Sequence, residues 1–254
     1  RLITGWTVDA SLEQSEACAV AVRWFKNKFN AVASEVNDHF AKFRISDALM
    51  AVYKFFWDDF CAWYLELVKP AYGSPIDAKT YESTLEFFES LLKMIHPIMP
   101  FITEELWHAV RERGENETIM FESYPVAGEC NAEYVSAFGL ATEAVAGIRN
   151  IRQQKGLSPK EPLKAYFVGD FSKEMESVVA KLANVNEIHH VSSIDDSLAG
   201  MSFMAGTVKV FVPLEGLVDA TEEIAKLEAE LEYLRGFLKS VRGKLSNEKF
   251  VSHA

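Results

Sequence analysis

Cysteines, long apolar runs and familiar catalytic motifs are scarce or missing in this sequence of 254 residues. Its three cysteines, Cys18, Cys61 and Cys130, are widely separated and form no Cys-x-x-Cys pair. We therefore expect free thiols in a reducing cytoplasm, and neither a disulfide framework nor a structural metal site. The apolar runs are far shorter than the roughly 20 residues of a transmembrane helix. With no visible signal peptide, the sequence predicts a cytoplasmic protein that does not cross a membrane.

The missing catalytic motifs exclude several enzyme classes. The sequence has no His-Glu-x-x-His, Gly-x-Ser-x-Gly, Walker or dinucleotide-binding glycine pattern. His189 and His190 are neighbours in an expected strand, where they point to opposite faces and do not form a ligand pair. The pair Asp58 and Asp59 is more typical of a solvated helix face than of acid–base catalysis. We expect no self-contained active site and no cofactor bound by this chain.

Positive charge is limited and uneven. Lys and Arg number 26 against 37 Asp and Glu, giving a net charge of -11, which argues against indiscriminate binding of nucleic acid. Residues 233–250 are an exception, because they hold five cations and a single anion, Glu248. A polyanionic partner would therefore meet local patches on an acidic body.

The pattern of apolar residues predicts a mainly α-helical protein. Helical spacing recurs over four segments separated by short, proline- or glycine-containing connections: 11–43, 46–67, 77–95 and 100–114. These predict an antiparallel helical bundle, which we assign to residues 1–128. The pattern of apolar residues over 129–219 predicts a small α+β subdomain with helices at 133–155 and about 172–184. Its strands are expected at "PLKAYFVGD", "NEIHHVSS" and the alternating "GTVKVFVPL".

A heptad seam fills the remaining segment, 220–254. Its apolar residues follow one another in steps of three and four: Ile224, Leu227, Leu231, Leu234, Leu238, Val241 and Leu245. Burying seven such side chains gains more than about 10 kcal/mol, so the seam needs a partner. We interpret the segment as the first helix of a truncated coiled-coil arm. The partner is a returning helix beyond Ala254, a second chain or another domain.

Two further stretches leave alternatives open. The aromatic stretch "FFWDDFCAWYLE" (55–66) fits a helix buried on most of its circumference, or one with an exposed ring that stacks on a base. In "GIRNIRQQKGLSPKEPLK" (147–164), Arg149 and Arg152 share a helix face. This stretch is either a solvated helix end or a phosphate-binding edge.

Four motifs resemble the valyl-tRNA synthetase family, in the same order and spacing over 6–254. They are "FCAWYLELVKP" (60–70), "HPIMPFITEELW" (96–107), "AGIRNIR" (146–152) and "KLSNEKFVSHA" (244–254). The resemblance implies that the helical half is the anticodon-binding bundle. It also implies that the coil is half of an antiparallel hairpin that leans on the outer corner of tRNA, its second strand beginning after Ala254.

The resemblance further implies partners and limits. The expected partners are tRNA(Val) and the catalytic domain of the same chain, in a monomeric enzyme that joins valine to tRNA with ATP. The ATP-binding signatures and the editing domain of the family are absent from this sequence, so the chain itself is expected to be non-catalytic, with ATP used elsewhere. Pairing of this chain through its coil is a further expectation, and the alternative function is a protein-interaction module or structural brace.

The expected tRNA contacts fall into three groups of basic residues. They are Arg149, Arg152 and Lys155 for the RNA backbone; Arg235, Lys239, Arg242 and Lys244 for the tRNA corner; and Lys26, Lys42 and Arg44 for the anticodon end of the bundle. Phosphate contacts of this kind supply affinity and position, whereas base contacts give identity.

Overall fold

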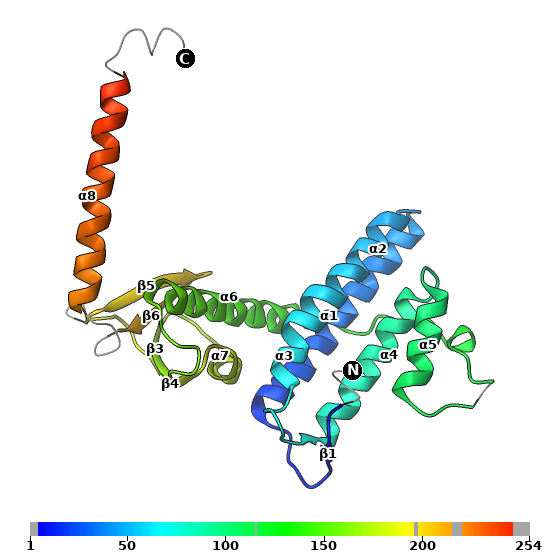
Figure 1. Ribbon diagram of the computed structural model, residues 1–254. Helices are drawn as coiled ribbons and strands as arrows, with labels where there is room; N and C mark the ends of the chain where they lie inside the picture. Colours follow the sequence, from blue (N-terminus) through cyan, green and yellow to red (C-terminus); the bar gives the residue numbers. More distant parts are fainter. Residues whose placement is uncertain (1–4, 115, 196–197, 215–219, 246–254) are drawn as a thin grey trace.

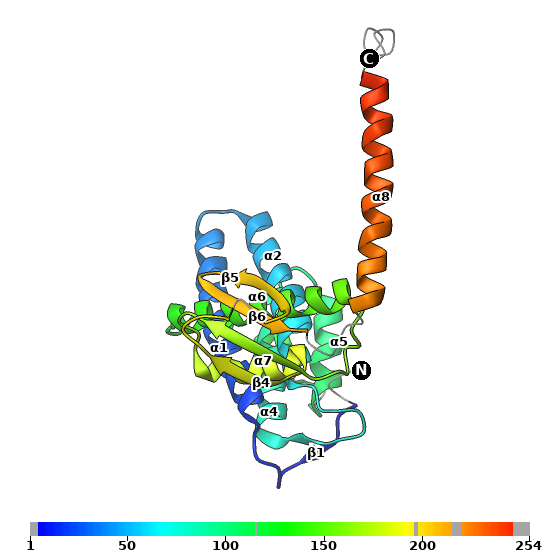
Figure 2. The same ribbon diagram turned by 90° about the vertical axis from the view of Figure 1, so that its left-hand side faces the viewer.

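The computed structural model describes residues 5–114, 116–195, 198–214 and 220–245. It is mainly α-helical with a small sheet, which confirms the predicted fold class. Figure 1 shows a group of helices beside a small α+β unit, from which one long helix projects. The view turned by 90° shows the same helix standing clear of the rest (Figure 2).

The helical half confirms the four expected helical segments. Its elements are β1 (Val8–Asp9), α1 (Glu16–Ala41), α2 (Ile45–Lys54), the π-helix η1 (Phe55–Tyr64), α3 (Leu65–Val68), β2 (Ile76–Asp77), α4 (Ala78–Ile95), α5 (Pro100–Val110) and the 3-10 helix η2 (Ile119–Phe121). Two of the long helices are capped at their N-termini by a side-chain oxygen. Ser15 accepts from the backbone N–H of Cys18 at α1, and Asp77 accepts from that of Thr80 at α4.

The second helical segment differs from the expected α-helix in its middle. Over η1 the backbone winds with i→i+5 hydrogen bonds, so residues five apart return to one face. This places Phe55 and Phe60 together in the core, where Tyr64 joins them around Phe25 of α1, with ring centroids 4.7, 5.4 and 4.9 Å from that of Phe25. Most of the aromatic stretch is therefore core, although Trp57 remains 60% exposed.

The second unit is built on a four-stranded sheet in the order β4-β3-β6-β5. Its elements are α6 (Ala132–Lys155), β3 (Leu163–Val168), the 3-10 helix η3 (Lys173–Met175), α7 (Glu176–Ala183), β4 (Val185–His190), β5 (Gly200–Ala205) and β6 (Val208–Pro213). Strands β3 and β4 are parallel and joined through α7, whereas β6 pairs antiparallel with β3 and β5. The sequence pattern missed β5, an edge strand with few β-branched residues.

One hydrophobic core runs through both units. Trp24 of α1 stacks on Phe138 of α6, with ring centroids 3.9 Å apart and planes inclined by 11°. Beside them, Arg23 of α1 pairs with Glu174 at 3.2 Å, and the hydroxyl of Tyr134 donates to the same carboxylate at 3.0 Å. The two units are thus packed against each other, while their division at 128/129 stays a prediction.

Two asparagines of α1 hold the chain that leads from one unit to the next. Asn30 accepts from the backbone N–H of Gly128 at 3.2 Å and donates to the carbonyl of Glu129 at 2.7 Å. One turn earlier, Asn27 accepts from the N–H of Asn131 at 2.7 Å. Asn131 in turn caps α6. The connection is therefore bonded to α1 just before α6 begins.

The projecting helix is α8 (Ala220–Leu245), so this segment is helical as expected, whereas its role as half of a coiled-coil arm stays a prediction. Leu231, Leu234 and Leu238 of the seam are about half exposed, so no described element covers these three side chains fully. The side chains of Ile224, Leu227 and Leu245 and the segment 246–254 lie outside what the structure describes. A partner for the seam stays a prediction.

Close packing at Gly147 offers a test of this fold. A Cβ at Gly147 of α6 would overlap the ring of Phe203 on β5, so Gly147→Ala should displace that ring and lower the free energy of unfolding by about 1–3 kcal/mol. Gly139, on the same helix, has open space around it. Gly139→Ala should be neutral or stabilising by up to about 1 kcal/mol. Urea unfolding measures both, and equal effects would contradict the packing of α6 on β5.

Candidate nucleic-acid interface

The structure separates the predicted basic residues into three places. The last turns of α6 hold Arg149, Arg152 and Lys155. Helix α1 and the turn after it hold Lys26, Lys42 and Arg44. Helix α8 holds Arg235, Lys239, Arg242 and Lys244. These places are on different elements (Figure 1), and their side chains have different surroundings.

The arginines of α6 bond to the end of another helix. Arg149 donates from Nε and Nη2 to the carbonyl of Leu182 at 3.2 and 2.9 Å. Arg152 donates from Nη2 to the carbonyls of Ala183 and Asn184, both at 3.0 Å. A helix leaves its last carbonyls without partners, and α7 ends at Ala183. The two arginines therefore cap α7 from outside.

Arg152 is buried, which limits the groups that its side chain can contact. Its residue surface is only 6% exposed, and its Nη1 donates to the carbonyl of Ser158 at 2.8 Å. Burial lowers the pKa of this guanidinium, and the charge of Glu161 opposes that shift. The group is thus turned inward on backbone oxygens, and the structure shows it as a support for the α6–α7 contact. A phosphate contact by Arg152 would require this arrangement to open.

The surface around these arginines is hollowed. An open pocket of about 410 Å³ is lined by Arg149, Arg152, Leu157 and residues of 182–184. Arg149 is exposed at this pocket and Lys155 is half-buried. Arg149 and Lys155 therefore remain candidates for backbone contact, and the structure does not test that prediction.

The turn between α1 and α2 presents an aromatic ring between two cations. Phe43 has a φ of 60° and is 89% exposed. Lys42 pairs with Asp38 at 2.6 Å, a hydrogen bond that lowers the pKa of the aspartate, whereas Arg44 forms no ion pair with any described residue. Phe43 is not among the predicted contacts, and the structure shows only that its ring is exposed in the turn.

The cations of α8 lie beside its seam. Arg235, Lys239 and Arg242 are exposed and follow one another in steps of four and three, so they share one face of the helix. Each follows a seam residue by one position. Lys244 belongs to the same helix, but its side chain lies outside the described part of the chain. Lys26 of α1 is also exposed.

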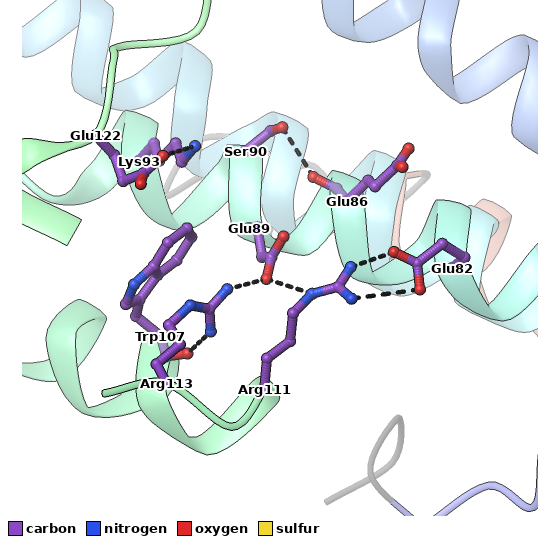
Figure 3. A network of polar contacts seen from close by, with 9 residues as sticks. All are labelled: Glu82, Glu86, Glu89, Ser90, Lys93, Trp107, Arg111, Arg113 and Glu122. Carbon is purple, nitrogen blue, oxygen red and sulfur yellow. Dashed lines mark hydrogen bonds and ion pairs between the residues drawn. The ribbon is translucent and has the colours of Figure 1, made fainter. Parts of the chain in front are cut away.

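Other cations are used inside the bundle. Figure 3 shows Arg111 between Glu82 and Glu89 of α4, with its Nε 2.8 Å from Glu89, and Arg113 on the same Glu89. The bond to Glu82 raises the pKa of Arg111. The guanidinium of Arg113 also lies 3.7 Å from the ring centre of Trp107. These charges hold the end of α5 on α4 and are already paired.

A parallel contact fixes the segment that follows α5. Lys93 of α4 pairs with Glu122 at 2.7 Å, and its ammonium group lies 5.1 Å from the ring centre of Trp107 (Figure 3).

In the described part of the chain, no three His, Cys, Asp or Glu side chains come together as metal ligands. No described helix is long and apolar enough to cross a membrane.

A helical bundle with an adjoining α+β unit and exposed basic helix faces suits a protein that positions a folded RNA. Residues 22–167, more than half of the chain, match the family described as "Anticodon-binding domain of tRNA ligase". The chain belongs to this family. The match begins within α1 and ends within β3, so it covers most of the bundle together with α6.

Curated relatives narrow the comparison to one kind of ligase. The chain is 48% identical over its whole length to the valine–tRNA ligases of Parabacteroides distasonis and Phocaeicola vulgatus. It is 35% identical, over 91% of its length, to that of Fusobacterium nucleatum subsp. nucleatum. The chain spans about 28–29% of the length of these relatives, in their C-terminal part. The resemblance inferred from the sequence motifs is thereby confirmed.

The two arginines of α6 can be told apart by mutation. Arg152→Met should lower the free energy of unfolding by about 2–3 kcal/mol, because buried carbonyls lose a charged donor. Arg149→Met, at an exposed site, should cost about 1 kcal/mol or less. Urea unfolding gives both values. If Arg152 instead bound a phosphate, Arg152→Met would flatten the salt dependence of tRNA binding by about one unit, which the capping role does not produce.

Proposed function

We propose that this chain is the tRNA-binding, non-catalytic part of a valine–tRNA ligase, and that its partner is tRNA(Val). The main support for this proposal is the similarity of the whole chain to the C-terminal part of valine–tRNA ligases. The exposed cations Arg235, Lys239 and Arg242 of α8 support it, because they face solvent and form no ion pair with a described residue, unlike Arg111.

The proposed binding is electrostatic at the arm and more selective at the bundle. Arg235, Lys239 and Arg242 stand on a helix that projects from an acidic body, so they can approach a phosphate backbone without bringing the acidic surface close. Such contacts position the RNA, whereas contacts to bases supply identity. The activation of valine with ATP belongs, in this proposal, to the rest of the ligase, acting as a cytoplasmic monomer.

One observation favours a second candidate function. The half-exposed Leu231, Leu234 and Leu238 of α8 form an apolar stripe, which is typical of a helix that pairs with another helix. A protein-interaction arm or a structural brace would use this stripe alone. The tRNA-binding arm needs the cations beside it as well.

Removal of the arm's charges tests the proposal. In the full-length ligase, replacing Arg235, Lys239 and Arg242 by glutamine should weaken tRNA binding, and each true phosphate contact removed should flatten the slope of log K against log salt by about one unit. Filter binding at several salt concentrations measures both quantities. Formation of valyl-adenylate should be unchanged, because these residues are proposed to touch RNA only.

A charge-matched control separates the arm from the body. Lys79, Lys173 and Lys181 are exposed lysines on the bundle and the α+β unit, and replacing all three by glutamine changes the net charge equally. This variant should keep the tRNA affinity and salt slope of the wild type. If the arm variant also keeps them, α8 is a protein-interaction arm or a brace and not an RNA contact.

A further inference from the structure

The pocket between the C-terminal ends of α6 and α7 has the size of a small-molecule site. Its volume is about 410 Å³, and such sites measure about 300–1,000 Å³, with mostly apolar walls and a few placed polar groups. The walls here include Leu157, Pro159 and Leu182, and the polar groups include Arg149 and Arg152. Among the described residues that line the pocket, none is acidic and none is aromatic. The pocket therefore offers positive charge beside hydrocarbon.

Hydrogen bonds to the backbone hold the walls of this pocket in place. Past the end of α6, the N–H of Leu157 donates back to the carbonyl of Arg152 at 2.9 Å. From the other wall, the Nδ2 group of Asn184 donates to the carbonyls of Pro159 and Glu161 at 3.1 and 3.2 Å. The pocket is therefore preformed, so a ligand would bind without the cost of ordering its walls.

Arg149 presents a free pair of N–H groups at this pocket. Its Nε and Nη2 donate along one edge of the guanidinium to the carbonyl of Leu182, which fixes the orientation of the group. A guanidinium carries five N–H donors in a rigid fork. The edge formed by Nη1 and the second N–H of Nη2 has no partner among the described residues. Two parallel N–H groups of this kind match the two oxygens of one carboxylate or phosphate.

Arg152 adds a second positive charge in the wall. It is only 6% exposed, its Nη atoms bond to backbone carbonyls, and its buried Nε has no partner among the described residues. Buried donors in native structures nearly all have partners, so this N–H favours an acceptor close to Arg152. The charge of Glu161 offsets the burial only in part, because the pKa of the guanidinium stays lowered. An anion in the pocket would stabilise this charge, which salt screens little at a buried site.

The lining discriminates among ligands. With no aromatic ring on the described lining residues, the pocket lacks a surface on which a nucleotide base would stack. The ammonium group of a free amino acid would be repelled by the two arginines. A phosphodiester of RNA would place its polar sugar against the apolar walls, where a hydrocarbon gains more from leaving water. A carboxylate on a hydrocarbon body suits both the arginines and the walls.

We propose that this pocket binds a small organic carboxylate with an apolar body, held by Arg149 as its bidentate partner. Arg152 contributes charge while it stays bonded to the end of α7. The proposal goes beyond the proposed function and does not depend on the binding of tRNA(Val). A phosphate of the RNA backbone, the contact predicted for Arg149 from the sequence, is the competing occupant.

Isocaproate, a branched aliphatic carboxylate, serves as the probe. In the full-length ligase, with excess valine present to occupy its amino-acid site, isocaproate should bind with a Kd on the order of 1 mM, as expected for a ligand of its size. Isocaproamide has nearly the same shape without the charge, and leucine is isocaproate with an added ammonium group. Each should bind at least about tenfold more weakly than isocaproate. Titrations followed by saturation-transfer NMR measure all three.

Substitution of Arg149 tests its role. Arg149→Met should raise the Kd for isocaproate at least about tenfold, because it removes a charge-assisted bidentate bond. Arg149→Lys keeps the charge but not the paired N–H groups, so its Kd should lie between those of the wild type and Arg149→Met. Lys181→Met is the matched control, because Lys181 is exposed on α7 beside Leu182 but outside the lining. It should change the Kd by less than about twofold, and circular dichroism checks that each variant is folded.

Three results would overturn the proposal. They are the absence of isocaproate binding to the wild type, an unchanged Kd in Arg149→Met, and binding of inorganic phosphate through Arg149 as tightly as isocaproate. The last result would assign the pocket to a phosphate, such as one of the RNA backbone. None of them affects the proposed function, which depends on the similarity to valine–tRNA ligases and on the arm.

Discussion

The packing of α1 against α6 is the contact on which the rest of the structure depends. The stacked rings of Trp24 and Phe138 join the core of the helical bundle to that of the α+β unit. Arg23 and the asparagines one and two turns further along α1 add polar bonds on the same side. Because α1 also packs on α2, η1 and α4, one helix orients both units. Loss of this contact would leave each unit with an exposed apolar face.

The spacing of apolar residues along the sequence was enough to predict most of the fold. The helices of the bundle and the strand β6 follow from regular apolar spacing, since regular elements bury one face. The π-helix could not be predicted, because placing Phe55 and Phe60 on one face depends on the ring of Phe25 from another helix. The edge strand β5 was missed for a related reason: its hydrogen bonds to β6 come from pairing across the sheet, and its own sequence shows little alternation.

The candidate site was less predictable, because the sequence gives the charged residues but not the groups that each of them contacts in the fold. Arg152 and Arg235 look alike in the sequence, yet the first is buried on backbone carbonyls and the second is exposed on α8. The family and the resemblance to valine–tRNA ligases were accessible from sequence motifs, and the comparisons confirmed both.

The π-helix holds an extra residue in each of its turns. An i→i+5 turn contains about one residue more than an α turn, so deleting one residue from the first turn of η1 would let that turn rewind as an α-helix with little rotation of the residues that follow. Tyr64 and Leu67, both fully buried, would keep their places in the core. The same deletion in α4 would turn every later residue of that helix by about 100°. The segment that looks most irregular is therefore the one whose length can change by a residue at the least structural cost.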